Sequence, residues 1–552
     1  MIYLITIFTI LFFLLAWWRL DWAVMFLIAA LSAYLIRFNI FGLPSTLLEV
    51  MIWAVFLSWF IKSRGYIIEN LKLSRFARSG VARKINRYPF DWEMTLLLLI
   101  ALAAAGVAGF NSGSLGIWKA YLFEPVMLFI VVFNIMARKP PYPPLQGGQN
   151  SLVRGVELIL WPLAVSALAV SIFAVYQKIT GQFIDNPAWA VEGARRVVSF
   201  FGYPNAVGLY LGPIVLVMIG WLSSVVARSS LFLSSSGERQ RDPGIQKGEE
   251  KNNLDCSSVP TSGLRKKIVC LRGNDKEEGV AQSGKFKIIF ISLTTILSLF
   301  AIYFAKSKGA LMGVAAGLIV FGLLAGRKVR LATIIFLILI GVGIAFYQPA
   351  RNLAVENITL TNLSGQIRKA GWSDAWQMLK HGRLITGAGL TNFQTAVAPY
   401  HTEGIFFKDP NDPDAQRKLV FNAAYRTAHW QPLEIYLYPH NIILNFWSEL
   451  GLAGLLLFIW IIGKYFWQGI SNLVIAASEP QSRNMNEAKI WIPGQARNDR
   501  KEWKFLNIGL ICTMVVIIVH GIVDVPYFKN DLAVMFWLFV AMMSLVKLKS
   551  IN

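Results

Sequence analysis

Five histidines are the side chains in this sequence best suited to moving a proton near neutral pH. They all lie in polar segments or at the ends of apolar ones, and they are His381, His401, His429, His440 and His520. His440 and Asn441 directly precede an apolar run, which predicts His440 at the mouth of a helix. Two roles fit that position, a general base and a helix cap.

The stretch from Ser364 to Lys380 predicts an amphipathic helix. Its apolar face carries Arg368 at the leading edge, then Trp372, Ala375, Trp376 and Leu379. A helix of this kind is expected to lie along a membrane surface, where its arginine faces lipid head groups. A guanidinium is a planar fork of donors that matches phosphate oxygens. Arg368 therefore either binds phosphate or snorkels from the interface.

Glu449 follows His440 in the same predicted helix and lies about two turns deeper. An ionisable group at membrane depth requires a partner or a water-filled cavity. A functional role is therefore the default expectation for Glu449.

The composition excludes a water-soluble globular protein. Of the 552 residues, 55% are apolar and only 15% are charged, and the mean hydropathy is +0.51. The net charge of +22 comes from Lys and Arg spread between apolar runs, so we expect no nucleic-acid partner. Cys256, Cys270 and Cys512 have no metal-ligand spacing, so neither a metal nor a disulfide framework is expected.

Apolar runs long enough to cross about 30 Å of hydrocarbon recur along the chain. They predict an all-α polytopic membrane protein with about 12–13 transmembrane helices and a large external loop that carries amphipathic helices. The expected spans lie near 2–17, 21–37, 42–61, 93–111, 117–137, 153–176, 204–226, 286–305, 309–325, 330–348, 442–465, 504–522 and 530–547.

Basic residues orient these spans, because loops rich in Lys and Arg stay in the cytoplasm. The loop after the third span contains Lys62, Arg64, Lys72, Arg75, Arg78, Arg83, Lys84 and Arg87. Alternation from this loop places residues 177–203, 349–441 and 523–529 outside, together with the N-terminus. The five histidines then all lie in or beside outer segments, which indicates that the chemistry is external.

The expected organisation is a membrane domain with two polar cytoplasmic inserts, 227–285 and 466–503. The parts are 1–92, with the first spans and the basic loop; 93–226, with the outer loop 177–203; the first insert; the spans in 286–348; the external catalytic loop 349–441; the span 442–465; the second insert; and the last spans in 504–552.

Several short motifs occur in an informative order. His440-Asn441, nine residues and Gly451-Leu452-Ala453-Gly454 resemble the signature of the O-antigen ligase and O-antigen polymerase superfamily. Three further stretches resemble family patterns: Arg195-Arg196 before Pro204-Asn205, Arg368 before the small-residue turn 385–389, and His520 with Asp524 near the last spans.

The resemblance implies a GT-C-like membrane glycosyltransferase that requires neither a metal nor a cofactor. Such an enzyme uses an undecaprenyl-diphosphate-linked glycan as donor and a glycan or lipid as acceptor. It works among membrane lipids on the outer, periplasmic face of the inner membrane, and it inverts the anomeric carbon. Its acceptor distinguishes a ligase of lipopolysaccharide biosynthesis from a polymerase of surface polysaccharide or an enzyme that glycosylates proteins.

The resemblance also implies roles for individual residues. His440 is the expected catalytic base, and Glu449 is expected to orient the catalytic site. Arg196, its neighbour Arg195, Arg368 and Lys308 are the expected diphosphate ligands, although Lys306 and Lys308 also fit as interfacial anchors. Asn441, His520 and Asp524 are expected to support the site.

Two other classes of protein stay open. A lipid-linked glycan transporter also needs phosphate-facing arginines, but it predicts inverted internal repeats that this sequence does not display. A scaffold of a polysaccharide assembly complex would tolerate the loss of both His440 and Arg368, which an enzyme would not.

Overall fold

The structure is a computed structural model, and it describes residues 2–40, 43–76, 88–137, 151–239, 254–258, 268–410, 412–477 and 494–551. The distal part of the predicted basic loop (77–87) and parts of both predicted inserts (240–253, 259–267 and 478–493) lie outside the described residues. Helices dominate the fold, as the sequence predicts, and the described strands form three two-stranded antiparallel hairpins.

The long helices form the body of the molecule. They are α1 (Ile2–Trp18), α2 (Leu20–Ala29), α3 (Leu47–Phe76), α5 (Asp91–Val107), α7 (Glu124–Ala137), α8 (Ser151–Thr180), α10 (Pro204–Arg239), α11 (Gly273–Ala305), α12 (Lys308–Ala325), α13 (Arg327–Phe346), α19 (Ile442–Ala477), α20 (Gly494–Gly521) and α21 (Asn530–Ile551).

The shorter elements are α6 (Ser112–Ile117), α9 (Pro187–Ala190), α14 (Gln348–Ile358), α15 (Leu363–Met378), α16 (Phe393–Val397), α17 (Ala415–Phe421) and α18 (Ala423–Ala428), with single turns η1 (Leu31–Leu35), η2 (Trp118–Phe123), η4 (Leu379–Arg383) and η5 (Ala398–Tyr400). The hairpins pair β1 (Arg37–Ile40) with β2 (Leu43–Thr46), β3 (Leu254–Ser258) with β4 (Ile268–Arg272), and β5 (Gly404–Phe406) with β6 (Trp430–Pro432).

Among the described residues, eight helical segments are long and apolar enough to cross a membrane. They are Ser112–Ala137, Gly155–Thr180, Pro204–Arg228, Gly284–Ala305, Lys308–Ala325, Arg327–Phe346, Ile442–Val474 and Trp503–Gly521. The chain is therefore an all-α, multi-pass membrane protein, as predicted, although the predicted count of spans was larger. The apolar helices Tyr3–Trp18 and Asn530–Val546 are shorter than this criterion.

The predicted span 21–37 is wrong as a single helix. The α-helix α2 ends at Ala29, and η1 and β1 follow it. Ten helical residues rise only about 15 Å, half of the hydrocarbon thickness. Hydropathy alone predicted a full span because a buried short helix and a transmembrane helix have the same apolar composition.

Close helix packing fixes the centre of the body. At the crossing of α10 and α20, a Cβ added to Gly220 would lie 2.7 Å from the Cα of Gly509. Such contact requires glycine on both helices, as is common where transmembrane helices pack. It sets the crossing of α10, which carries Asn205 near its start, and α20, which carries His520 near its end.

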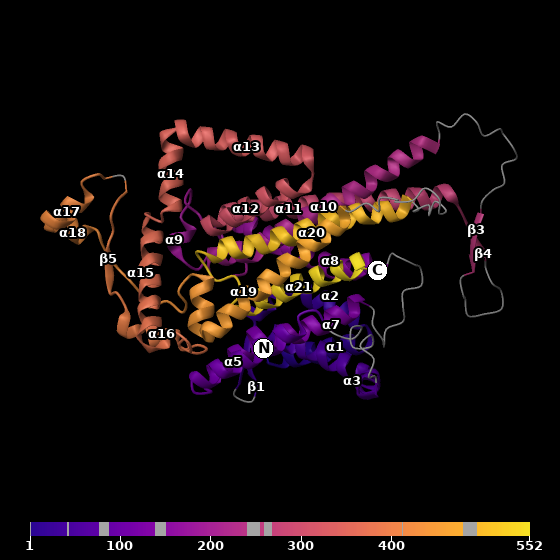
Figure 1. The fold of residues 1–552 in the computed structure, drawn as a ribbon, viewed down its shortest axis with the longest axis horizontal. Coiled ribbons are helices and arrows are strands. Elements are labelled where there is room, and N and C mark those ends of the chain that lie inside the picture. The colour runs from indigo at the N-terminus through magenta and orange to yellow at the C-terminus, as the bar shows by residue number, and fades with distance from the viewer. Residues whose placement is uncertain are drawn as a thin grey trace.

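One end of the bundle has a different architecture. In Figure 1, α14 and α15 run across the direction of α10, α11 and α20, and α17 and α18 lie beyond them. The predicted amphipathic helix corresponds to α15, and its buried residues are Gly365, Asp374, Ala375 and Met378. The side chain of Asn362 caps the helix by accepting from the Gly365 N–H at 2.8 Å. This crossing helix presents Arg368 to the ends of the spans.

Candidate functional site

Segments far apart in the sequence meet at this end of the bundle. Arg196 comes from the loop before α10, Arg368 from α15, His440 from the segment before α19, and Asp524 from the turn between α20 and α21. Side chains from all three predicted outer segments line two adjoining cavities there. The predicted topology placed these segments on one side, and the fold brings them together.

The first cavity, here named the cationic cavity, has a volume of about 220 Å³. Its charged lining residues are Arg196, Lys306, Lys308, Arg368 and Asp524, and His520 also lines it. Four cations therefore surround a space to which a single carboxylate contributes. Such a cavity attracts an anion with several oxygens, such as a phosphate or diphosphate.

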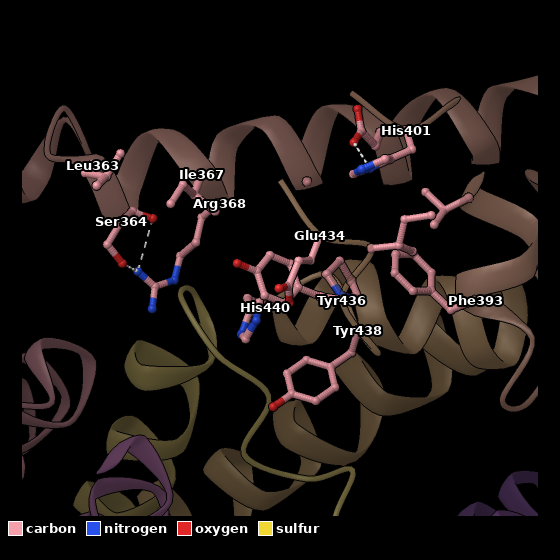
Figure 2. A pocket seen from close by; sticks show the side chains of 15 residues that line it. Leu363, Ser364, Ile367, Arg368, Phe393, His401, Glu434, Tyr436, Tyr438 and His440 are labelled. Carbon is pink, nitrogen blue, oxygen red and sulfur yellow. Dashed lines mark hydrogen bonds and ion pairs between the residues drawn. The ribbon is translucent and has the colours of Figure 1, made fainter. Parts of the chain in front are cut away.

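The second cavity, here named the histidine cavity, has a volume of about 230 Å³. Arg368 and Ser364 line both cavities and so mark their boundary. Figure 2 shows Arg368 and His440 pointing into the histidine cavity from opposite elements, with Tyr436 and Tyr438 beside His440. The carboxylates of Asp374 and Glu434 also line it, so its charge differs from that of the cationic cavity.

Hydrogen bonds fix the guanidinium of Arg368. Its Nε donates to the Val523 carbonyl at 3.0 Å, and its Nη1 donates to the Ser364 hydroxyl. These bonds occupy Nε and Nη1, and no described residue accepts from Nη2. A side chain held in this way is preorganised to bind an anion.

Arg196 faces the same cavity. Its Nε donates to the Ala305 carbonyl at 3.1 Å, and its Nη2 lies 3.5 Å from Asn205 Oδ1. Burial and the positive charge of Arg368 lower the pKa of Arg196 below its ordinary value. An anion between the two arginines would relieve their mutual repulsion.

A polar network joins Arg196 to His440. The Asn205 amide donates from Nδ2 to Asp524 Oδ2 at 3.3 Å, and Asp524 Oδ1 lies 3.7 Å from His440 Nδ1. The last distance is too long for a hydrogen bond and short enough for an ion pair. Burial raises the pKa of Asp524, but the imidazoles of His440 and His520 more than offset this effect, so it stays below its ordinary value.

The backbone of His440 has φ of 48°, a left-handed conformation that non-glycine residues rarely adopt. Its ring contacts Tyr436 and Tyr438 edge-on, with centroid distances of 5.0 and 4.8 Å. Asn441 caps the start of α19, where its Oδ1 accepts from Leu444 N, and its Nδ2 donates to the Ile522 carbonyl. With Asp524 beside Nδ1, the Nε2 atom of His440 is the atom available to a substrate.

Two of the predicted diphosphate ligands differ in placement. The guanidinium of Arg195 donates to the carbonyls of Lys178, Ile179 and Ala190, and it lines neither cavity. Lys308 does line the cationic cavity, where its Nζ donates to Asn357 Oδ1 at 3.0 Å. Arg196 therefore faces the cationic cavity, whereas Arg195 stabilises the loop before α10 through its bonds to backbone carbonyls.

The predicted support residue His520 is buried, and its ring closes one wall of the cationic cavity. A Cβ on Gly309 would lie 2.6 Å from its Cδ2. Two of the other histidines lie away from both cavities, since His381 contacts the Gln377 carbonyl and His429 stacks on Tyr425. His401 lines the histidine cavity, with its Nδ1 3.5 Å from Asp374.

Glu449 lines neither cavity in the described part of the chain. Its buried carboxylate accepts from the Thr391 N–H at 2.7 Å. The partner that an acid at this depth requires is therefore the backbone of the turn after α15. This contact ties Glu449 to that turn and keeps its carboxylate out of both cavities.

The motif that contains Gly451 and Leu452 packs directly on the small-residue turn 385–389. Gly451 interrupts α19 with φ of 70°, and Leu452 N then donates to the Ile385 carbonyl at 2.9 Å. Ala388 N donates to the Ser448 carbonyl at 2.6 Å across the same contact. The small residues of both motifs allow this approach, which ties α15 to the helix that follows His440.

Sequence reasoning missed the roles of Asn205, Tyr436 and Tyr438. Asn205 appeared in a motif, but its link between Arg196 and Asp524 depends on the loop fold. The tyrosines had a readable signal, because 436, 438 and 440 alternate along an extended segment and so share one face.

The fold and these cavities define a polytopic membrane protein with a cation-lined, histidine-bearing site at one end of its bundle. Residues 293–459 match the family model described as O-Antigen ligase. This match confirms the predicted resemblance to the O-antigen ligase and polymerase superfamily, and it supports glycosyltransferase-like activity of the ligase or polymerase type. The match includes Lys308, Arg368 and His440 but not Arg196 or Asp524. No curated protein matches the chain.

Proposed function

We propose that this protein transfers a glycan from an undecaprenyl-diphosphate carrier to an acceptor hydroxyl on the outer face of the cytoplasmic membrane. The observation that carries the proposal is the cationic cavity, with four cations around one carboxylate, directly beside His440. A ligase-type reaction is the first candidate, and a polymerase of the same superfamily differs only in its acceptor.

The reaction is a displacement at the anomeric carbon of the donor. The acceptor oxygen forms the new glycosidic bond while the bond to the diphosphate oxygen breaks. The Nε2 atom of His440 takes the acceptor proton, and the nearby Asp524 stabilises the resulting imidazolium. The diphosphate departs with the bonding electrons, and the anomeric configuration inverts.

The diphosphate gains negative charge as it departs, and Arg196 and Arg368 are positioned to stabilise that charge without a divalent metal. Arg368 can act at the moment of bond breaking because it lines both cavities. Lys308 adds longer-range attraction from the rim. His520 and Asn441 hold the walls of the site, and Glu449 holds the turn on which α15 rests.

The test is transfer by the purified protein in lipid nanodiscs with an undecaprenyl-diphosphate-linked oligosaccharide. The acceptor panel contains lipid A core, a second copy of the donor glycan and a serine-containing peptide, all with chelator present. We expect transfer by the wild type and by Arg417→Ala, an exposed control on α17, and loss of transfer by folded His440→Ala and Arg368→Ala. Full activity of both site variants would refute the proposed site, and the productive acceptor separates ligase from polymerase.

A further inference from the structure

A third cavity, here named the aromatic cavity, lies beyond Tyr438 from the histidine cavity. Its volume is about 710 Å³, within the range typical of small-molecule sites. Elements from both ends of the chain line it: the β1–β2 hairpin, α6 and the start of α21. Tyr438 lines both this cavity and the histidine cavity, so one side chain separates them.

The wall of this cavity suits a saccharide. Four tyrosines line it, and they are Tyr34, Tyr121, Tyr203 and Tyr438. A sugar ring has apolar C–H faces that pack on aromatic rings, and hydroxyls at its edge that need hydrogen-bond partners. Tyrosine provides both kinds of contact in one side chain.

Buried polar atoms at the cavity have no partner within the protein. The Tyr34 hydroxyl and Asn530 Oδ1 have no hydrogen-bond partner among the described residues, although each residue is only 3% exposed. Such groups are rare because desolvation without a partner costs about 1–3 kcal/mol each. A ligand with several hydroxyls would satisfy both.

The charge of the lining favours an acidic ligand. Lys529 Nζ lies 5.0 Å from the ring of Tyr34 and 4.8 Å from that of Tyr203, and no described residue accepts a hydrogen bond from it. Arg37 is a second, exposed cation at the cavity. The one lining carboxylate, Glu49, is already paired with Lys119 at 2.6 Å.

The aromatic and cationic cavities adjoin different faces of the same two segments. Consecutive residues of the turn before α21 line different cavities, since Asp524 lines the cationic one and Val525 the aromatic one. Likewise, Asn205 lines the cationic cavity and Tyr203 lines the aromatic one. A displacement with inversion requires the nucleophile to approach from the side opposite the leaving group.

We propose that the aromatic cavity is the subsite for the acceptor saccharide, and that it favours a saccharide with a carboxylate or phosphate group. This inference rests on the proposed function, which places the donor diphosphate in the cationic cavity. It adds residues of the N-terminal third of the chain to the site, all of them outside the matched segment 293–459.

The first test fills the cavity. Gly116 lines it, and a Cβ added there meets no atom within 4 Å, so Gly116→Phe should fold. Gly463→Phe, on an exposed and equally open position of α19, is the matched control. We expect Gly116→Phe to raise the acceptor KM at least about tenfold, a loss of about 1.4 kcal/mol, with unchanged affinity for undecaprenyl diphosphate. An unchanged acceptor KM would overturn the inference and leave the proposed function intact.

The second test removes one unpartnered group. Tyr34→Phe should raise the acceptor KM about fivefold, because a hydrogen bond to the ligand is lost. It should not lower the Tm, because that hydroxyl stabilises nothing in the free protein. A lower Tm with an unchanged KM would indicate a structural role and would overturn the inference.

Direct binding keeps the inference separate from catalysis. Calorimetry without donor would compare a glucuronic-acid-containing tetrasaccharide, its phosphate-bearing counterpart and the neutral tetrasaccharide. Tighter binding of either acidic probe by wild type, and its loss in Gly116→Phe, would support the subsite even if no acceptor of the panel were productive. Equal binding of all three probes would overturn the acidic preference, and equal binding by both proteins would overturn the subsite.

Discussion

The cationic and histidine cavities have almost the same volume, about 220 and 230 Å³, but they differ in the balance of charge that lines them. Four cations line the first, whereas Asp374 and Glu434 line the second together with His401 and His440. A departing diphosphate needs positive charge, and an imidazole that accepts a proton is stabilised by nearby negative charge. In the proposed reaction, these two requirements fall in separate cavities of one site, with Arg368 at the boundary.

The largest expected effect comes from the histidine cavity alone. His440→Ala should lower kcat about 10³-fold because the general base is lost. Its affinity for undecaprenyl diphosphate should stay unchanged, because His440 lines only the histidine cavity of this pair. Initial rates at saturating substrate and calorimetric binding would measure the two quantities. A parallel loss of diphosphate affinity would mean that the cavities do not work separately.

A variant at the boundary should affect both quantities. Arg368→Ala is expected to lower kcat about 10²-fold and also to weaken undecaprenyl diphosphate binding, because one fixed donor group is lost. Arg368→Lys restores the charge but not the planar fork, so it should recover affinity more than rate. Recovery of the full rate by lysine would show that charge alone matters at this position.

Arg195 and Arg196 are neighbours in sequence, but only Arg196 lines the cationic cavity. Arg196→Ala should weaken diphosphate binding about tenfold, because it removes one charged donor from the cationic cavity. Arg195→Ala should leave binding unchanged and lower the Tm, because three backbone carbonyls lose their donor. Equal effects of the two substitutions on binding would contradict the placement of Arg195 outside the cavity.

The smallest expected effect concerns the link between the cavities. The folded protein holds the pKa of Asp524 below the ordinary value of about 3.9, so its ionised form adds stability above that pH. This contribution is lost as the pH falls through the folded pKa. The Tm gap between wild type and Asp524→Asn should therefore shrink from pH 6 to pH 3. Asp414→Asn, at an exposed position, should show no such change.

Much of the site was predictable because its parts are marked by residue type. Arg368 on an amphipathic helix, His440 before an apolar run and Arg196 before Pro204 all carried local signals, and the charge rule placed them on one side. The predicted helix 364–380 is present as α15 with its π-helical extension η4. The lengths of the apolar runs likewise predicted most of the long helices.

The remaining features depend on tertiary contacts that no local pattern encodes. Arg195 and Arg196 are identical in type, and only the loop fold decides which of them faces the cavity. A functional role was predicted for Glu449 because an acid in an apolar helix needs a partner, but no local pattern predicts that this partner is the backbone of Thr391. The helix α2 ends at Ala29 and is followed by η1 and β1, and hydropathy carries no information about that change of backbone.

The shared position of Arg368 also has a consequence for inhibitor chemistry. Each of the two cavities is smaller than the approximately 300 Å³ at which drug-sized pockets begin. A weakly bound anionic fragment in one and a neutral ring in the other would meet at the same guanidinium. Joining such fragments by a short linker makes the second binding step intramolecular, so the affinity of the joined molecule exceeds that of either part.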